Sequence, residues 1–346
     1  MNIFVSLILS IIIVISLNVF SDGTPGNVIL ITFDGVRWQE VFNGTDPQLT
    51  NKKEQLFKIL WEKYAKNGLV LGDKNKGSMI RTGNPVNISL PEYQALMSGV
   101  ITPCQGNGCS QIKEETFMEK IQKDLDLKFY DIGVVASWET IKKSVASVEG
   151  SFLVNTGITP LIDEQFPDSH KEINELQKAD KPKWGSARKD KYTFLHAKNF
   201  IKNHKPRFFY ISFDDSDEWG HLNEYEQYCE SLKMYDRWID ELITMLKAMP
   251  GYGENTTLIF TTDHGRGDGK EWTSHGPKIA GSENIWAFIY GPDTPKLGSI
   301  INQKAYTHLN FFLTIESFIT GEYPKMFRAP AIVEAFKNDH DVYVNR

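Results

Sequence analysis

The chain has 346 residues, of which 41% are hydrophobic and 24% charged, and its formal net charge is −6. This composition is typical of a globular protein with one large domain or two modest ones. The mild acidic excess, and the lack of a basic stripe with interleaved aromatic residues, argue against nucleic-acid binding.

The first segment is almost entirely apolar from Ile3 to Phe20 and is followed by a polar, turn-prone stretch at 21–26. We predict that residues 1–21 form a secretory signal peptide, with Val19-Phe20-Ser21 as the cleavage site, although no Lys or Arg precedes the apolar run. The alternative is an uncleaved anchor, because the run is just long enough to span a membrane. Both interpretations predict an exported protein.

Three cysteines remain in the exported part. Export permits a disulfide, and Cys104 and Cys109 bracket a short loop, so they are a candidate pair. Cys229 lies on the apolar face of a predicted helix, where we expect a buried free thiol.

Apolar runs of strand length alternate with segments that have helical spacing. We predict strands at 27–33, 130–138, 208–213, 257–262 and 285–290. We predict helices within 48–67, 92–97, 191–204, 224–249, 304–319 and 330–337. This alternation predicts an α/β fold with a doubly wound, largely parallel central sheet flanked by helices. The predicted organisation is one catalytic domain at 22–346 with a cap-like insertion within about 100–195.

Acids, imidazoles and a hydroxyl follow the predicted strands, where open α/β sheets bind their ligands. They are Asp34, Ser89, Asp217, His221, Asp263, His264 and His275. Carboxylate with imidazole suits zinc, and manganese is possible. Seven ligands are too many for one catalytic zinc, so the set predicts two divalent metal ions that share an in-line displacement at phosphorus.

The order of these elements resembles the alkaline phosphatase superfamily. The resemblance rests on Asp34, Ser89-Leu90-Pro91 at a helix start, Asp217-Glu218-Trp219-Gly220-His221, Asp263-His264-Gly265 and His275-Gly276. It runs from about Val28 to Pro292 and is greatest to the type I phosphodiesterase/nucleotide pyrophosphatase group and its bacterial phosphomutase-like relatives. It implies an alkaline-phosphatase-like fold and a metal-dependent hydrolase of phosphate esters, acting on a small-molecule phosphate ester or nucleotide.

The resemblance also implies roles for single residues. Asp34, Asp263 and His264, with the Ser89 oxygen, are expected to hold one metal ion. Asp217, His221 and His275 are expected to hold the other. Ser89 stands in the position of the nucleophile, so it is expected to form a phosphoserine that hydroxide then hydrolyses. Asn107 is the candidate donor to the phosphoryl oxygens.

The sequence departs from the related groups at this segment. The nucleotide pyrophosphatase group typically has threonine where Ser89 stands and asparagine where Glu92 stands. Sulfatases carry x-Pro-Ser-Arg after their Cys or Ser, and the arginine is missing here, which makes a sulfatase less favoured. A broad phosphomonoesterase is the main alternative, and a binding protein on an inactive hydrolase scaffold is another.

Some residues have competing interpretations. Asp214 and Asp215 rival Asp217, which is favoured by its four-residue step to His221 across a tight glycine-containing turn. Ser89 could instead be an N-cap serine. We expect Arg37 to be solvated and His308 to be packed at a helix start.

Overall fold

The computed structural model describes residues 25–185, 187–302, 304–322 and 329–337. The expected signal peptide at residues 1–21 lies outside these ranges, so its cleavage stays a prediction. Within them, no helix combines the length and the apolar character that crossing a membrane requires.

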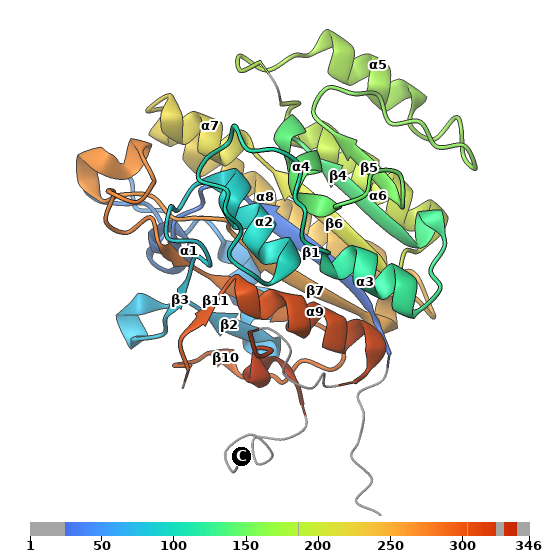
Figure 1. Ribbon diagram of the computed structural model, residues 1–346. Helices are drawn as coiled ribbons and strands as arrows, with labels where there is room; N and C mark the ends of the chain where they lie inside the picture. The colour runs from blue at the N-terminus through green and yellow to red at the C-terminus, as the bar shows by residue number, and fades with distance from the viewer. Residues whose placement is uncertain (1–24, 186, 303, 323–328, 338–346) are drawn as a thin grey trace, which may run out of the picture.

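One large sheet organises the molecule (Figure 1). Its strands are β1 (Asn27–Phe33), β2 (Leu69–Leu71), β4 (Ile132–Ala136), β5 (Leu153–Thr156), β6 (Phe208–Phe213), β7 (Thr256–Thr261), β9 (Ala287–Tyr290) and β10 (Gly298–Ser299). They lie in the order β10-β2-β9-β7-β1-β6-β4-β5. All neighbouring pairs are parallel except those of β9 with β2 and with β7. The predicted largely parallel α/β sheet is confirmed.

The central strands are buried along their whole length. Every residue of β1, β6 and β7 is buried, and β1 pairs in parallel with both of the other two. A strand that is covered on both faces has no polar side, so its sequence is a continuous apolar run. For this reason the sequence alone predicts these three strands.

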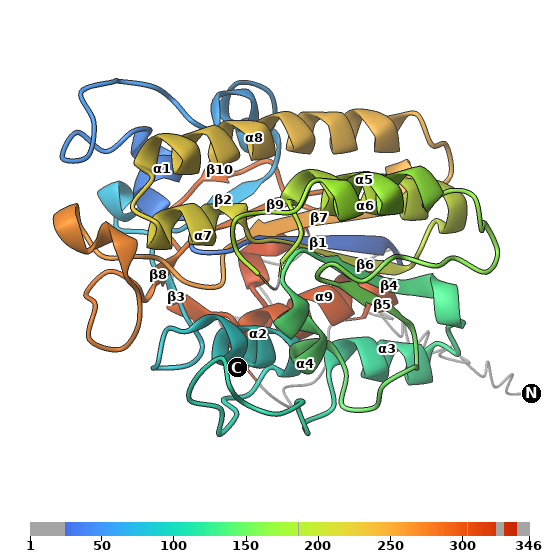
Figure 2. The same ribbon diagram turned by 90° about the horizontal axis from the view of Figure 1, so that it is seen from above.

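Helices cover both faces of the sheet (Figure 2). α6 (Asp190–His204) and α8 (Tyr225–Lys247) form one layer, and α2 (Ser89–Ser98), α3 (Phe117–Asp124), α4 (Lys142–Val145) and α9 (Leu309–Thr320) form the other. The side chains of β1 alternate between the layers, as a strand requires. Ile29 and Ile31 belong to the core under α8, whereas Val28 and Leu30 belong to the core under α9.

In the part of the chain that the structure describes, a small second sheet and three further α-helices lie beside these layers. The second sheet has the strand order β11-β3-β8, with β3 (Ile80–Arg81), β8 (Asn284–Ile285) and β11 (Tyr306–Thr307). The further helices are α1 (Trp38–Asn43), α5 (Lys171–Ala179) and α7 (Asp215–His221).

Three predicted elements differ from the structure. The helix expected within 48–67 starts only at residue 58 and continues as a π-helix at Leu60–Tyr64 and a 3₁₀ helix at Ala65–Asn67. The first amides of a helix have no partner within the helix. Here the Asp236 carboxylate of α8 accepts hydrogen bonds from the amides of residues 59 and 60, so the helix begins at this point. The strand expected at 285–290 divides into β8 and β9, which join different sheets, and the segment at 330–337 contains only a 3₁₀ helix at Val333–Ala335.

The segment at 100–195, the least regular in sequence, contributes strands to the large sheet and helices that lie outside it. β4 and β5 extend the sheet, whereas α5 lies outside it and packs against α6 (Figure 1). The role of this segment as a substrate cap stays a prediction. Cys104 and Cys109 form a disulfide in the loop after α2, and Cys229 is a buried free cysteine.

Candidate metal centre

The carboxyl ends of three adjacent parallel strands carry the acids that the sequence pointed to. Asp34 follows β1, Asp217 lies in α7 directly after β6, and Asp263 follows β7. Because β1 pairs in register with β6 on one side and β7 on the other, the three strands end at the same edge of the sheet. Side chains more than 180 residues apart in sequence therefore meet there.

The first group consists of Asp34, Asp263 and His264, which are all buried and lie close enough together to share one metal ion. The His264 Nε2 atom is 3.5 Å from Asp34 Oδ1 and 3.3 Å from Asp263 Oδ2. Neither of these two carboxylate oxygens has a hydrogen-bond partner among the described residues. A buried unpaired oxygen is costly, so both oxygens are available to bind a cation.

The other atoms of the first group are held in place by hydrogen bonds. Asp263 Oδ1 accepts from the amide of Gly35 at 3.0 Å, and Asp34 Oδ2 accepts from the Tyr93 hydroxyl at 3.0 Å. His264 Nδ1 lies 2.9 Å from the Gly265 carbonyl oxygen. Because a carbonyl oxygen only accepts, Nδ1 carries the proton, and the Nε2 lone pair is directed at the two acids.

The second group consists of Asp217, His221 and His275. Asp217 Oδ2 is 3.0 Å from His221 Nε2, which is in turn 3.3 Å from His275 Nε2. His275 Nδ1 donates to the Asn87 carbonyl oxygen at 3.0 Å, so its Nε2 also presents a lone pair. The predicted turn between Asp217 and His221 is wrong: both lie on α7, where a four-residue step puts them on one helical face.

The two groups form one continuous site. The rings of His264 and His275 stack at a centroid distance of 3.8 Å, and the rings of His221 and His275 are 5.1 Å apart. α2 and α7, which carry Ser89 and the acid–imidazole pair, lie at the same end of the sheet (Figure 2). The structure therefore brings together every predicted metal ligand.

Burial sets the protonation of the first group. Burial, and next the charge of Asp217, raise the pKa of Asp263 to about 6, and burial with the charge of Asp263 raises the pKa of Asp34 well above its usual range. Burial lowers the pKa of His264 to about 4. The imidazole is therefore neutral, as a metal ligand must be, while the acids lack a compensating positive charge.

The second group has a cation of its own. Burial opposes the ionisation of Asp217, but Arg266 and His221 hold its pKa well below its usual range. The Arg266 guanidinium is fully buried and forms an ion pair with Asp217 Oδ1, which leaves Oδ2 facing His221. Burial, and next the neighbouring His264, lower the pKa of His275 to about 3. Asp217 with its hydrogen bond, and next its charge, raise the pKa of His221. Both groups thus combine carboxylate with imidazole, which are ligand types that suit divalent metal ions.

Ser89 is the first residue of α2 and is buried beside the first group. Its Oγ atom is 3.2 Å from His264 Nε2. The N-cap of α2 is Ile88, and the Ser89 hydroxyl does not cap the helix, so the N-cap alternative is wrong. Asn107 lies directly beside Ser89, because its Oδ1 atom accepts from the Leu90 amide at 3.0 Å.

Sequence reasoning missed two residues of the site, Tyr93 and Arg266, and misjudged the burial of Arg37. Tyr93 stands one helical turn after Ser89, and this spacing could have indicated that it faces the same group. Arg266 directly follows Asp263-His264-Gly265, but a single arginine gives no signal by itself. Arg37 is not solvated but fully buried, because Glu40 and Asp46 supply its counter-charges and the Gly267 carbonyl accepts from it at 2.9 Å.

His308 is packed, as expected, and it connects α2 to β7. Its Nδ1 atom is 2.8 Å from a Glu92 carboxylate oxygen, and its Nε2 atom is 2.8 Å from the Thr262 carbonyl oxygen. Both side chains of this pair are fully buried. The pair fixes α2 against the strand end that carries Asp263.

Similar folds occur in several solved structures. A putative sulfatase from Bacteroides thetaiotaomicron VPI-5482 has 14% identity and a TM-score of 0.61, over 90% of this chain and 74% of that one. The phosphonate monoester hydrolase of Agrobacterium radiobacter has 14% identity and a TM-score of 0.56, over 85% of this chain and 74% of that one. The phosphonate monoester hydrolase SpPMH from Silicibacter pomeroyi has 11% identity and a TM-score of 0.57, over 88% and 75%. At such identities the similarity shows a shared fold.

The sequence itself matches a family model. The model described as Metalloenzyme superfamily matches residues 119–304, which is more than half of the chain and includes Asp217, His221, Asp263, His264 and His275. The chain therefore belongs to the metalloenzyme superfamily, the alkaline-phosphatase-like group that its motifs resemble.

Proposed function

We propose that the protein is an exported hydrolase of phosphoric esters that uses two divalent metal ions and a phosphoserine on Ser89. The observation that carries the proposal is the position of the Ser89 hydroxyl, 3.2 Å from His264 Nε2 and beside the unpaired oxygens of Asp34 and Asp263. An unactivated serine is a poor nucleophile, so its location at a ligand set is what makes it competent.

Asp34, Asp263 and His264 would hold one metal ion and Asp217, His221 and His275 the other. The proposed metal is Zn²⁺, with Mn²⁺ as the alternative. Bound metal ions supply positive charge that stabilises the attacking and leaving oxygens of the displacement. The protein orients the reacting groups: Tyr93 and Gly35 hold the two acids of the first group, and α2 holds Ser89.

In the proposed reaction the Ser89 hydroxyl loses its proton as the Oγ–P bond forms and the ester P–O bond breaks, and the leaving oxygen takes up a proton. A water oxygen then forms a bond to phosphorus as the Oγ–P bond breaks, and a proton from that water returns Ser89 to its hydroxyl form and the phosphate product is released. Asn107 would bind a phosphoryl oxygen. The Leu90 amide can only donate, so it fixes Oδ1 as its acceptor and leaves the Asn107 Nδ2 group able to donate to substrate.

Diesters or pyrophosphates are proposed ahead of monoesters. A phosphate monoester carries more charge on its free oxygens and needs additional positive charge in the site. Among the described residues, Arg266 is the arginine that contacts the ligand set, and it is fully buried and paired with Asp217. It therefore does not present its charge to a substrate, which supports the diester preference over the monoesterase alternative.

Sulfate esters are the second candidate, because solved structures of similar fold include sulfatases. In sulfatases an arginine would stand near the position of Tyr93. Here Tyr93 is buried and donates its hydroxyl to Asp34, so this position supports the metal ligand and offers no cation. This favours phosphoric esters over sulfate esters.

The proposal of export rests on the apolar segment at 3–20 and is supported by the disulfide between Cys104 and Cys109, since disulfides persist in oxidising compartments. The expected partner is a small-molecule phosphate ester or nucleotide. No nucleic-acid binding is expected, and a membrane association is expected only if the N-terminal segment is retained.

The test is a comparison of p-nitrophenyl phosphate, bis-p-nitrophenyl phosphate and p-nitrophenyl sulfate as substrates. The wild type, Ser89→Ala and a matched control, Ser98→Ala at the other end of α2, are assayed after chelation and after resupply of zinc or manganese. We expect fastest turnover of the diester, loss of activity on chelation, and loss in Ser89→Ala only. Mass spectrometry of acid-quenched wild type is expected to show phosphate on the peptide that contains Ser89.

Each outcome has a consequence. Full activity of Ser89→Ala would remove the covalent mechanism, and faster turnover of the monoester would reverse the substrate order. Preference for the sulfate would establish the second candidate. Metal binding without turnover of any ester would indicate a binding protein on an inactive scaffold.

A further inference from the structure

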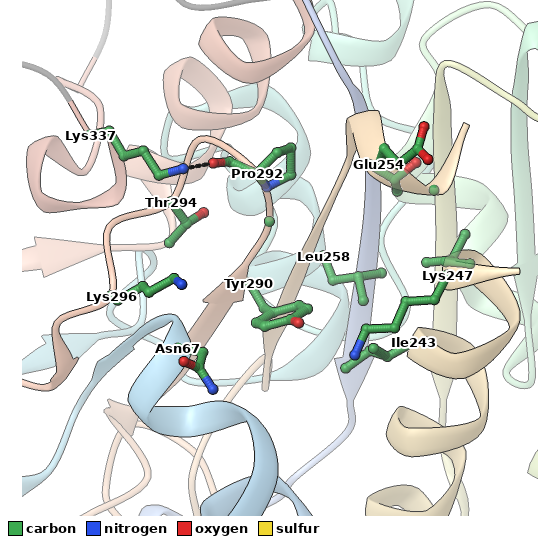
Figure 3. Close-up of a pocket in the computed structure, with 14 residues that line it drawn as sticks. Asn67, Ile243, Lys247, Glu254, Leu258, Tyr290, Pro292, Thr294, Lys296 and Lys337 are labelled. Atoms are coloured by element: carbon green, nitrogen blue, oxygen red, sulfur yellow. Dashed lines mark hydrogen bonds between the residues drawn. The ribbon is translucent and has the colours of Figure 1, made fainter. Parts of the chain in front are cut away.

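A hollow lies at the opposite end of the sheet from the metal centre. It has a volume of about 310 Å³, which is within the size range of small-molecule sites. Its lining includes residues at the start of β7 and the end of β9 (Figure 3). Since β7 begins at residue 256 and Asp263 follows its other end, the two sites are roughly 20 Å apart along the strand.

Positive charge gathers in this hollow although the chain as a whole carries a net charge of −6. Lys247, Lys296 and Lys337 line it, with Glu254 as the acidic residue among the lining side chains. Figure 3 shows the amino groups of Lys247 and Lys296 extending toward Tyr290 from opposite sides. Among the described residues, neither of these two lysines forms an ion pair, and Lys247 instead lies over the Tyr64 ring.

A buried hydroxyl in the hollow lacks a partner. Thr294 is 1% exposed, and its Oγ1 atom has no hydrogen-bond partner among the described residues. The side chain lines the hollow, and Figure 3 shows its oxygen directed into it. Buried polar atoms in folded proteins are almost always paired, so this one is positioned to bond with something that enters the hollow.

The floor between the charges is apolar. Tyr290 presents its ring, and Leu258 and Ile243 lie beside it (Figure 3). A concave, partly aromatic surface with a few polar groups at its margin is the usual form of a small-molecule site. An inorganic ion would use the lysines and Thr294 but leave this floor in water, so the hollow fits a larger anion.

We propose that this hollow is a second binding site, separate from the metal centre, for a small organic anion. The ligand carries a carboxylate, phosphate or sulfate group, which Lys296, Lys247 and the Thr294 hydroxyl bind, on a flat or apolar body that lies over Tyr290. The site does not depend on the metal ions or on Ser89, so it stands whether or not the proposed ester hydrolysis is correct.

The test uses 1-naphthoate, which has no ester bond, titrated into chelator-treated full-length protein by calorimetry. We expect binding of one molecule per chain, and about tenfold or greater weakening in Lys296→Glu because a charged hydrogen bond is lost. Thr294→Val, which removes the hydroxyl at nearly constant shape, is expected to weaken binding several-fold. Lys178→Glu, an equal charge change on exposed α5, is the matched control and should bind as the wild type does.

Circular dichroism and the melting temperature identify any variant that fails to fold, and Lys296→Gln then replaces Lys296→Glu. The neutral analogue 1-naphthylmethanol should bind at least several-fold more weakly than 1-naphthoate. Equal affinity of the wild type and folded Lys296 variants would overturn the site. Binding that appears only after zinc is restored would also overturn it, because the probe would then occupy the metal centre.

Discussion

Replacement of Tyr93 by phenylalanine tests how the metal centre is built. The Tyr93 hydroxyl donates to Asp34 Oδ2 at 3.0 Å, and both side chains are buried. Burial raises the pKa of Asp34 well above its usual range, and the hydrogen bond from Tyr93 opposes this. Tyr93→Phe therefore leaves a carboxylate that is more easily protonated and no longer oriented toward the metal position.

The size of the effect follows from the kind of bond that is lost. A hydrogen bond to a buried charged group contributes about 1.5–3 kcal/mol. Loss of a group that orients a metal ligand typically weakens metal affinity by about 10- to 100-fold, which is a free energy of the same size. Since Tyr93→Phe raises the pKa of Asp34 and the metal requires the ionised form, the loss of affinity should grow as the pH falls from 8 to 6.

Competition between the protein and a zinc chelator measures this affinity directly, without an activity assay. Tyr210→Phe is the matched control: Tyr210 is a fully buried tyrosine of β6 in the same core layer, but its hydroxyl pairs with Thr32 at 2.8 Å. We expect Tyr210→Phe to bind zinc as the wild type does. Equal zinc affinity of Tyr93→Phe and Tyr210→Phe at every pH would refute the role of Asp34 as a ligand held by Tyr93.

Three further predictions concern stability. Chelation should lower the melting temperature, because each metal ion at 100 times its dissociation constant stabilises the fold by about 2.7 kcal/mol; a melting temperature that chelator does not change would contradict metal binding. His196→Gln should reduce the loss of stability in acid. Burial lowers the pKa of His196 to about 2, so below about pH 6.5 this histidine is protonated in the unfolded state but neutral in the folded state. This difference lowers the free energy of unfolding by about 2 kcal/mol at pH 5 and does not change it at pH 8. Urea unfolding at both pH values checks this, and an unchanged pH dependence in His196→Gln would count against it. Glu92→Gln should destabilise the fold by about 1–3 kcal/mol in the same assay, because the amide nitrogen cannot accept the hydrogen bonds that the carboxylate receives from the Gly83 and Asn84 amides and from His308.

The fold was predictable where an element is buried on both faces or along one regular face. β1, β6 and β7 are covered on both faces, so their sequences are continuous apolar runs, and α8 has one buried face with regular spacing. Prediction failed where tertiary contacts decide the local structure. The amides at the start of the helix after residue 57 are bound by Asp236, which lies about 177 residues away, and no local pattern reveals that contact.

Candidate ligands were predictable for a related reason. A residue that follows a buried parallel strand must lie at one edge of the sheet, so Asp34, Asp217 and Asp263 were expected to converge. Asp214 and Asp215 also follow β6, but only Asp217 lies one helical turn before His221. Glu40 is a local partner of Arg37, but the buried state of Arg37 was not predictable, because Asp46 and the Gly267 carbonyl meet it only in the folded chain.

His275 and Ser89 depend on a different kind of constraint, because neither follows a strand of the central sheet. His275 Nδ1 donates to the Asn87 carbonyl, two residues before Ser89, so one hydrogen bond ties the loop of the second group to the start of α2. The Glu92–His308 pair in turn ties that helix to the end of β7. The sheet therefore fixes the acids, whereas loop contacts fix the distance between Ser89 and the second group. A change confined to the loop that carries His275 should move that group relative to Ser89 while leaving the sheet, and the first group with it, intact.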